Sequence, residues 1–87
     1  MPERTATIAS AVGLHARPAG VFTQRVKASG LAVKIAKEGG QFVNAASPLS
    51  IMTLGAQHGD QVLLSAEGDN ADAVLDSLVA LLESDLD

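Results

Sequence analysis

The spacing of hydrophobic positions changes repeatedly along the chain and divides it into short elements. Between residues 31 and 37, the apolar residues Leu31, Val33 and Ile35 alternate with other residues, which predicts a strand with one buried face. Three other short segments are rich in β-branched or aliphatic residues and are also predicted to be strands: 5–9, 41–44 and 61–66. Residues 38–40, with the sequence Glu-Gly-Gly, favour a hairpin turn between two of these strands.

Two longer segments follow the helical period, with apolar residues three or four positions apart. The first is predicted to begin at Ala16 and to end at Gly30, a residue type that commonly terminates helices. Its apolar stripe consists of Ala19, Phe22 and Val26. The second is predicted near the C-terminus, where Asp69 or Asn70 can cap its start. Its apolar stripe consists of Val74, Leu75, Leu78 and Leu82.

A third, shorter helix is predicted in the middle of the chain. Ser47 is a favourable N-cap, and Pro48 suits the first helical position, where a missing N–H leaves no intrahelical bond unmade. This helix is predicted to run through Leu54 and to stop at Gly55. A turn over residues 57–60 then leads into the last strand.

The predicted element order is therefore β-α-β-β-α-β-α. Four strands and three helices in 87 residues favour the α+β class, with a single domain over residues 1–87. In such a domain the helices pack on one face of the sheet. The opposite face of an antiparallel sheet can stay in contact with water.

Composition excludes several classes of protein. The chain has no cysteine, so disulfides and zinc sites with thiolate ligands are excluded. Its net charge is -4, it has no basic stripe, and it has neither Tyr nor Trp, which argues against nucleic acid binding. No apolar stretch approaches membrane-spanning length, and residues 1–4 do not resemble the start of a signal peptide. A cytoplasmic protein with an aliphatic core is expected.

One histidine lies where the first helix is predicted to start. His15 directly precedes Ala16, Arg17 and Pro18. A helix start presents N–H groups without intrahelical partners and the positive end of the helix dipole, which together bind anions such as phosphate. The dipole disfavours an imidazolium, so the His15 ring is expected to be neutral and nucleophilic, and Arg17 could reach a phosphoryl oxygen. These residues alone indicate either an anion site or an ordinary surface histidine, and they do not distinguish binding from transfer.

Two separated segments resemble one protein family. Residues 13–19, Gly-Leu-His-Ala-Arg-Pro-Ala, are similar to the phosphorylation-site signature of HPr, a phosphocarrier of the sugar phosphotransferase system. Residues 43–55, Val-Asn-Ala-Ala-Ser-Pro-Leu-Ser-Ile-Met-Thr-Leu-Gly, resemble the family's regulatory-serine segment and second helix. The length and the element order of the whole chain are also similar. The resemblance implies an open-faced β-sandwich, in which three helices cover one side of a four-stranded antiparallel sheet.

The resemblance further implies a stoichiometric phosphocarrier rather than an enzyme. His15 would accept a phosphoryl group on Nδ1 from phosphorylated enzyme I and pass it to the IIA domain of a sugar permease. Arg17 would help to position the group, and the helix start at Ala16, Arg17 and Pro18 would stabilise it. Neither a metal nor a cofactor is expected, and the carrier is expected to be a monomer.

The second segment implies a regulatory serine and a docking surface. Ser47 matches the serine that HPr kinase modifies in some members of the family. Ala46 stands where a lysine is common, and Pro48 follows the serine, so these departures argue against modification here. Leu49 and Met52 match an exposed apolar patch that docks partner proteins.

Two other hypotheses come from different classes of protein. A regulatory binding module of the same fold would act by docking a transcription factor or an enzyme, as some relatives without the histidine do, but His15 and Arg17 argue against it. An unrelated anion-binding α+β domain would require both segment matches to be coincidental. Within the family, a sugar relay and a parallel nitrogen-related relay both fit the sequence.

Overall fold

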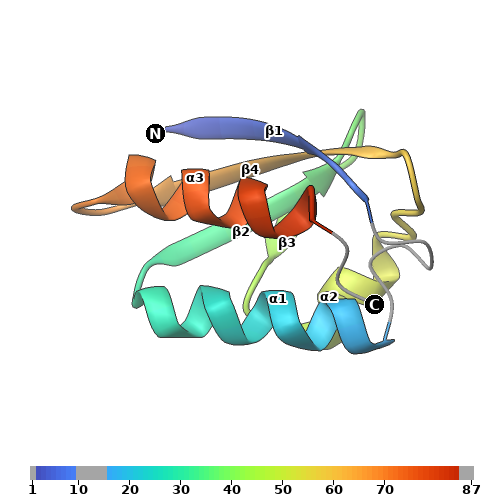
Figure 1. Ribbon diagram of the computed structural model, residues 1–87, viewed down its shortest axis with the longest axis horizontal. Coiled ribbons are helices and arrows are strands. Elements are labelled where there is room, and N and C mark those ends of the chain that lie inside the picture. The colour runs from blue at the N-terminus through green and yellow to red at the C-terminus, as the bar shows by residue number, and fades with distance from the viewer. Residues whose placement is uncertain (1, 10–15, 85–87) are drawn as a thin grey trace.

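The computed structural model describes residues 2–9 and 16–84 and has two layers (Figure 1). One layer is a sheet of four antiparallel strands, and the other consists of three helices on one face of that sheet. In chain order, the elements are β1 (Glu3–Thr7), α1 (Ala16–Ser29), β2 (Ala32–Lys37), β3 (Val43–Asn44), α2 (Pro48–Thr53), β4 (Gln61–Glu67) and α3 (Ala71–Leu82). The predicted class, element order and one-sided helical cover are therefore confirmed.

The strands are arranged in the order β1-β4-β2-β3, and each pair of neighbours is antiparallel. Side chains that point toward the helices are buried, among them Ala6, Val33, Ile35, Val62, Leu64 and Ala66. Side chains at alternate positions reach the other face, where Glu3, Thr5 and Thr7 of β1 are exposed. The sheet is thus packed on one side and open on the other.

The helices bury the stripes that the sequence predicts. The predicted stripe of α1 lies in the core, where Ala19, Phe22 and Val26 are at most 1% exposed. The α3 residues Leu75, Leu78 and Leu82 are buried to the same degree, whereas Val74 is only partly buried. Phe42 is 41% exposed, so Phe22 is the one aromatic side chain in the core of the described residues, and the expectation of an aliphatic core holds.

The first strand lies earlier in the chain than the sequence predicts. The sequence predicts a strand over residues 5–9, but β1 covers Glu3–Thr7, because this segment pairs with residues 61–65 of β4. Beyond Thr7 the backbone leaves β4: the Ile8 N–H donates a hydrogen bond to the carbonyl of Asp60, in the turn that precedes β4. Ile8 is therefore buried without belonging to the ladder, and Ala9 is partly buried.

Two further predictions need correction. A strand was predicted over residues 41–44, but β3 contains only Val43–Asn44, since only these residues pair with β2. Asn70, rather than Asp69, occupies the N-cap position of α3, and its side chain makes no capping hydrogen bond. Its backbone is left-handed (φ 66°, ψ 17°), which differs from the extended geometry of a residue whose side chain caps a helix.

Candidate functional site

The start of α1 is where the predicted anion site would form. The helix begins at Ala16, the residue after His15 in the chain, and its first turn carries no acidic side chain. The first N–H groups of α1 therefore meet no carboxylate from their own turn, and the positive end of the dipole can attract an anion. His15 lies outside the described residues, as do the side chains of residues 16–18, which include Arg17 and Pro18.

Buried contacts fix the position of α1. Besides the apolar stripe, Thr23 is only 2% exposed. Its hydroxyl donates a hydrogen bond to the carbonyl oxygen of Gly20 at 3.1 Å, so this buried polar group is satisfied within the helix. Sequence reasoning missed Thr23, because one threonine beside an apolar stripe gives no separate signal.

Ser47 caps α2, as the sequence predicts. Its Oγ accepts a hydrogen bond from the Ser50 N–H at 3.3 Å, and Pro48 occupies the first helical position. The preceding turn is fixed by Asn44, whose Oδ1 accepts a hydrogen bond from the Ala46 N–H at 2.9 Å. Asn44 and Ser47 thus act in succession to set where α2 begins.

The two predicted docking residues differ in exposure. Leu49 is 70% exposed, the highest value among the large apolar side chains that the structure describes. Met52 is only partly exposed and also packs against the core. Ile51 is fully buried and holds α2 in place. Leu49 therefore has the exposure of a docking residue, whereas Met52 offers only part of its surface.

The helices α1 and α2 pack against each other. In Figure 1, α2 and the start of α1 lie at the same end of the molecule. The exposed Leu49 is therefore carried on the helix beside the end at which α1 begins. A partner protein that approached the start of α1 would meet α2.

A turn before β4 anchors the chain where β1 ends. Asp60 Oδ2 accepts a hydrogen bond from the Gln57 N–H at 2.9 Å and lies 3.4 Å from Lys37 Nζ. These contacts lower the pKa of Asp60, with the Gln57 hydrogen bond as the largest cause. The Asp60 carbonyl accepts the hydrogen bond from Ile8, just beyond β1. Sequence reasoning predicted this turn but missed the carboxylate that organises it.

Two common kinds of functional feature, a metal site and a membrane-spanning helix, are absent from the described residues. Within residues 2–9 and 16–84, no group of three or more histidine, cysteine or acidic side chains could hold a metal ion. None of the helices in these two ranges is long and apolar enough to cross a membrane. A hollow of about 260 Å³ lies on the open face of the sheet, away from α1, and its lining includes Thr5, Ala36, Phe42 and Leu63. The start of α1 and the neighbouring α2 are thus the candidate site.

Comparison with known proteins gives matches over nearly the whole chain. Residues 2–84 match the family described as the PTS HPr component phosphorylation site. The chain is 42% identical over 87 residues to phosphocarrier protein HPr of Streptomyces coelicolor, covering 100% of this chain and 94% of that protein. It is 40% identical over 83 residues to phosphocarrier protein HPr of Haloferax volcanii, covering 94% and 93%. A solved structure, HPr-C-His from Thermoanaerobacter tengcongensis, matches with a TM-score of 0.88 and 42% identity, covering 97% and 93%.

Proposed function

Because the chain belongs to the HPr family of the phosphotransferase system, we propose that it accepts a phosphoryl group on His15 from phosphorylated enzyme I and passes it to IIA domains of sugar permeases. Proteins of this family are carriers and not catalysts. The observation that carries the proposal is the position of His15, immediately before a helix whose first turn has no acidic side chain.

The proposed transfer is a substitution at phosphorus. The Nδ1 lone pair of the neutral His15 ring forms a bond to phosphorus, while the bond from phosphorus to the nitrogen of the enzyme I phosphohistidine breaks and that nitrogen keeps the electron pair. Transfer to a IIA domain repeats the step with the His15 nitrogen as the leaving group. Both steps need in-line approach and stabilisation of the phosphoryl oxygens. In this proposal, Arg17 and the first N–H groups of α1 supply that stabilisation.

In the proposed relay, the exposed side of α2 docks both partners. Leu49 provides the main apolar contact, and the exposed part of Met52 extends it. A small apolar patch suits complexes that must form and separate in each cycle, because a large buried interface would slow dissociation. The carrier acts as a monomer in this cycle.

The proposal is tested by incubating the protein with phosphoenolpyruvate and enzyme I and measuring its intact mass. The expected result is a gain of one phosphoryl group that is labile in acid and is lost in His15→Ala. His58→Ala is the matched control, because His58 is exposed in the turn before β4, and this variant should still gain the group. A folded native protein that gained no group would instead favour the regulatory module that docks a transcription factor or an enzyme.

Regulation by phosphorylation of Ser47 is not part of this proposal. The Ser47 side chain is half-buried, and its Oγ already accepts the capping hydrogen bond from Ser50. Pro48 directly follows it and fixes the local backbone. Stoichiometric labelling by HPr kinase and ATP that disappeared in Ser47→Ala would overturn this view.

A further inference from the structure

The helical layer contains a groove between the second half of α1 and the first half of α3, with a volume of about 280 Å³. Leu78 is buried and Val74 is half-buried, so these two residues form an apolar floor. The small side chains of Ala28 and Ala73 are exposed and leave the groove accessible from both helices. The groove is therefore an open apolar slot on the surface of the helical layer.

Arg25 spans this groove from α1 to α3. Its Nη1 donates a hydrogen bond to Ser77 Oγ at 3.2 Å, and both side chains line the groove. Among the described residues, this hydrogen bond is the one polar contact of the Arg25 side chain, and no carboxylate there forms an ion pair with it. The remaining N–H groups of the guanidinium and the hydroxyl hydrogen of Ser77 have no acceptor in this part of the chain.

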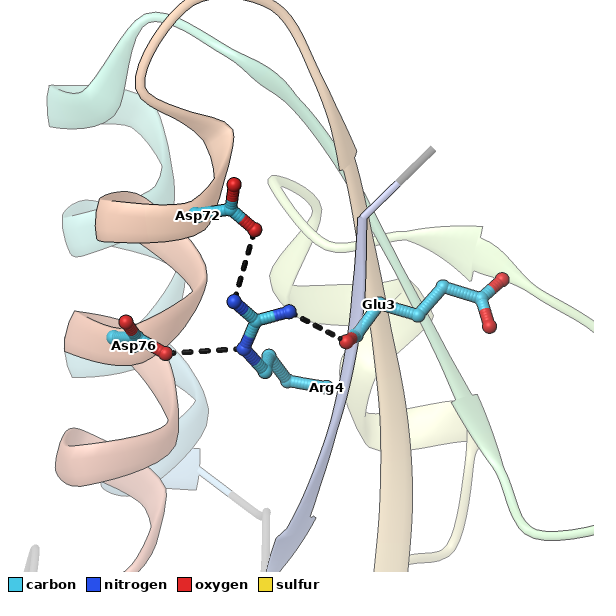
Figure 2. A network of polar contacts seen from close by, with 4 residues as sticks. All are labelled: Glu3, Arg4, Asp72 and Asp76. Carbon is cyan, nitrogen blue, oxygen red and sulfur yellow. Dashed lines mark hydrogen bonds and ion pairs between the residues drawn. The ribbon is translucent and has the colours of Figure 1, made fainter.

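The acidic side chains of α3 do not supply that acceptor, because they serve another residue. Arg4 Nη2 lies 2.9 Å from Asp72 Oδ1, and Arg4 Nε lies 3.0 Å from Asp76 Oδ1. Figure 2 shows both aspartates turned toward Arg4 of β1. Neither aspartate lines the groove, so Arg25 is the single charged residue of its lining. The groove thus combines one positive charge with an apolar floor.

The length and the charge of the groove define what can occupy it. The lining residues fall within 25–29 of α1 and 73–78 of α3, a length of about 6 to 8 Å along the helices. This length suits a short chain molecule but not a docked helix, which averages about 11 residues. One guanidinium balances one negative charge, and it matches a carboxylate through two parallel N–H···O bonds. The fitting ligand is a short aliphatic chain that ends in a carboxylate.

We propose that the groove between α1 and α3 binds a free aliphatic carboxylate. The Arg25 guanidinium and the Ser77 hydroxyl donate hydrogen bonds to the carboxylate, and the aliphatic chain lies on Val74 and Leu78. The hydrogen bond to Ser77 already holds Arg25 across the groove, so binding costs little side-chain freedom. The proposal does not depend on the phosphocarrier function.

The groove lies away from the proposed transfer site. It is formed by the end of α1 and the start of α3, whereas α2 and the start of α1 lie at the other end of the molecule (Figure 1). About 14 Å of helix separates Ala16, where α1 begins, from Arg25. A bound carboxylate therefore leaves α2 and the start of α1 uncovered.

The test uses hexanoate as the probe and follows the backbone amides of the native protein by nuclear magnetic resonance. Hexanoate is expected to shift the amides of residues 25–29 and 73–78 with a dissociation constant of about 1 mM or lower, and to leave those of α2 unchanged. Hexan-1-ol, which lacks the charge, and acetate, which lacks the chain, should each bind at least about tenfold more weakly. The tripeptide Gly-Gly-Leu should also bind at least about tenfold more weakly, because its amide groups would enter an apolar groove without partners.

Arg25→Gln tests the contact with the carboxylate. It removes the charge but keeps a polar side chain, and it should raise the dissociation constant for hexanoate at least about tenfold. Lys27→Gln is the matched control, because it removes the same charge from an exposed residue of the same helix that does not line the groove. Its dissociation constant should equal the native value. Unchanged affinity in a folded Arg25→Gln variant would overturn the proposal.

Ala73→Leu tests the apolar slot independently of charge. It fills the groove from an exposed helical position with a residue that favours helices, so the variant should fold and show no hexanoate shifts. Ala80→Leu enlarges an exposed residue of α3 outside the lining and should bind hexanoate as the native protein does. Native hexanoate affinity in a folded Ala73→Leu variant would contradict the proposed site.

Three results with the native protein would also overturn the proposal. In the first, hexan-1-ol or Gly-Gly-Leu binds as tightly as hexanoate, so that the carboxylate or the free chain is not what the groove recognises. In the second, hexanoate shifts only amides outside residues 25–29 and 73–78. In the third, no amide shifts at hexanoate concentrations up to about 50 mM.

Discussion

Leu49 and Ile51 are two residues apart in α2 but have opposite surroundings. Leu49 is 70% exposed, whereas Ile51 is fully buried. The helix has only six residues, so one side can face the core while the other is left to solvent. Two apolar pairs in the sequence have the spacing of one helical turn, namely Leu49 with Met52 and Ile51 with Leu54. In the structure the second pair is the more deeply buried of the two.

Leu49→Glu is expected to lower kcat/KM for phosphoryl transfer from enzyme I by about tenfold or more, because it replaces an exposed apolar contact with a charge. The free energy of unfolding should change by less than about 0.5 kcal/mol, as for other exposed positions. Phe42→Glu is the control, since it changes an exposed apolar residue on the open face of the sheet, and its transfer rate should equal the native rate. Strong destabilisation by Leu49→Glu would mean that this residue belongs to the core.

For a single residue, the sequence predicts which chemistry the side chain can perform more readily than which other side chains surround it in the folded protein. The helix start alone predicts an anion site beside His15 and Arg17, and it is the resemblance to the HPr family that predicts phosphoryl transfer there; both side chains lie outside what the structure describes. The hydrogen bond from Gln57 to Asp60 lies within one turn, but the second partner of Asp60, Lys37, reaches it only in the folded chain and gives no signal in the sequence. Partners that are distant in sequence leave no local pattern.

The start of α2 is an element that the sequence does define. Its cap, Ser47, and its first helical residue, Pro48, were both predicted, because capping depends on residues within one turn of each other. The bounds of β1 were not predicted, since the ladder with residues 61–65 decides where it ends. Asn70 shows the same limit: its residue type favours a cap, but its backbone is left-handed and its side chain makes no capping hydrogen bond.

Ser47→Ala is expected to lower the free energy of unfolding by about 1 kcal/mol, because it removes the side chain that accepts from the Ser50 N–H. Ser47→Asp should retain most of the stability, since aspartate is also a good cap and its charge suits a helix N-terminus. Urea denaturation of the three proteins measures the difference. Equal stability of Ser47→Ala and the native protein would show that the capping bond contributes nothing net.

At the scale of the whole molecule, the sheet order joins elements that are distant in sequence. The chain begins with β1, yet β1 pairs with β4, and β4 pairs with β2 on its other side. The element types predict one sheet and its helical cover, but they do not predict the strand order, because the strands have similar aliphatic patterns. The order follows from which register buries the apolar faces together, a property of all the elements at once.

The turn at Asp60 lies beside the ends of β1, β2 and β4, and we expect it to make the stability of the whole molecule depend on pH. Its contacts lower the pKa of Asp60 below the ordinary aspartate value of about 3.9. A carboxylate with a lowered folded-state pKa contributes stability that is fully present above the unfolded value and is lost as the pH falls through the folded value. Asp60→Asn is therefore expected to be less stable than the native protein at neutral pH and to lose less stability between about pH 4 and about pH 2.

Urea midpoints measured across this range should bring the native and Asp60→Asn curves together at the acid end. Asp69→Asn is the control, because it removes an exposed aspartate that lies outside the turn at Asp60. The stability of this variant should fall with decreasing pH as steeply as that of the native protein. Curves for Asp60→Asn and the native protein that stayed parallel over the whole range would mean that the Asp60 charge does not contribute. The hydrogen bond from Gln57 would then be satisfied equally well by a neutral amide oxygen, and the turn would hold β1 by its backbone bonds to Ile8 alone.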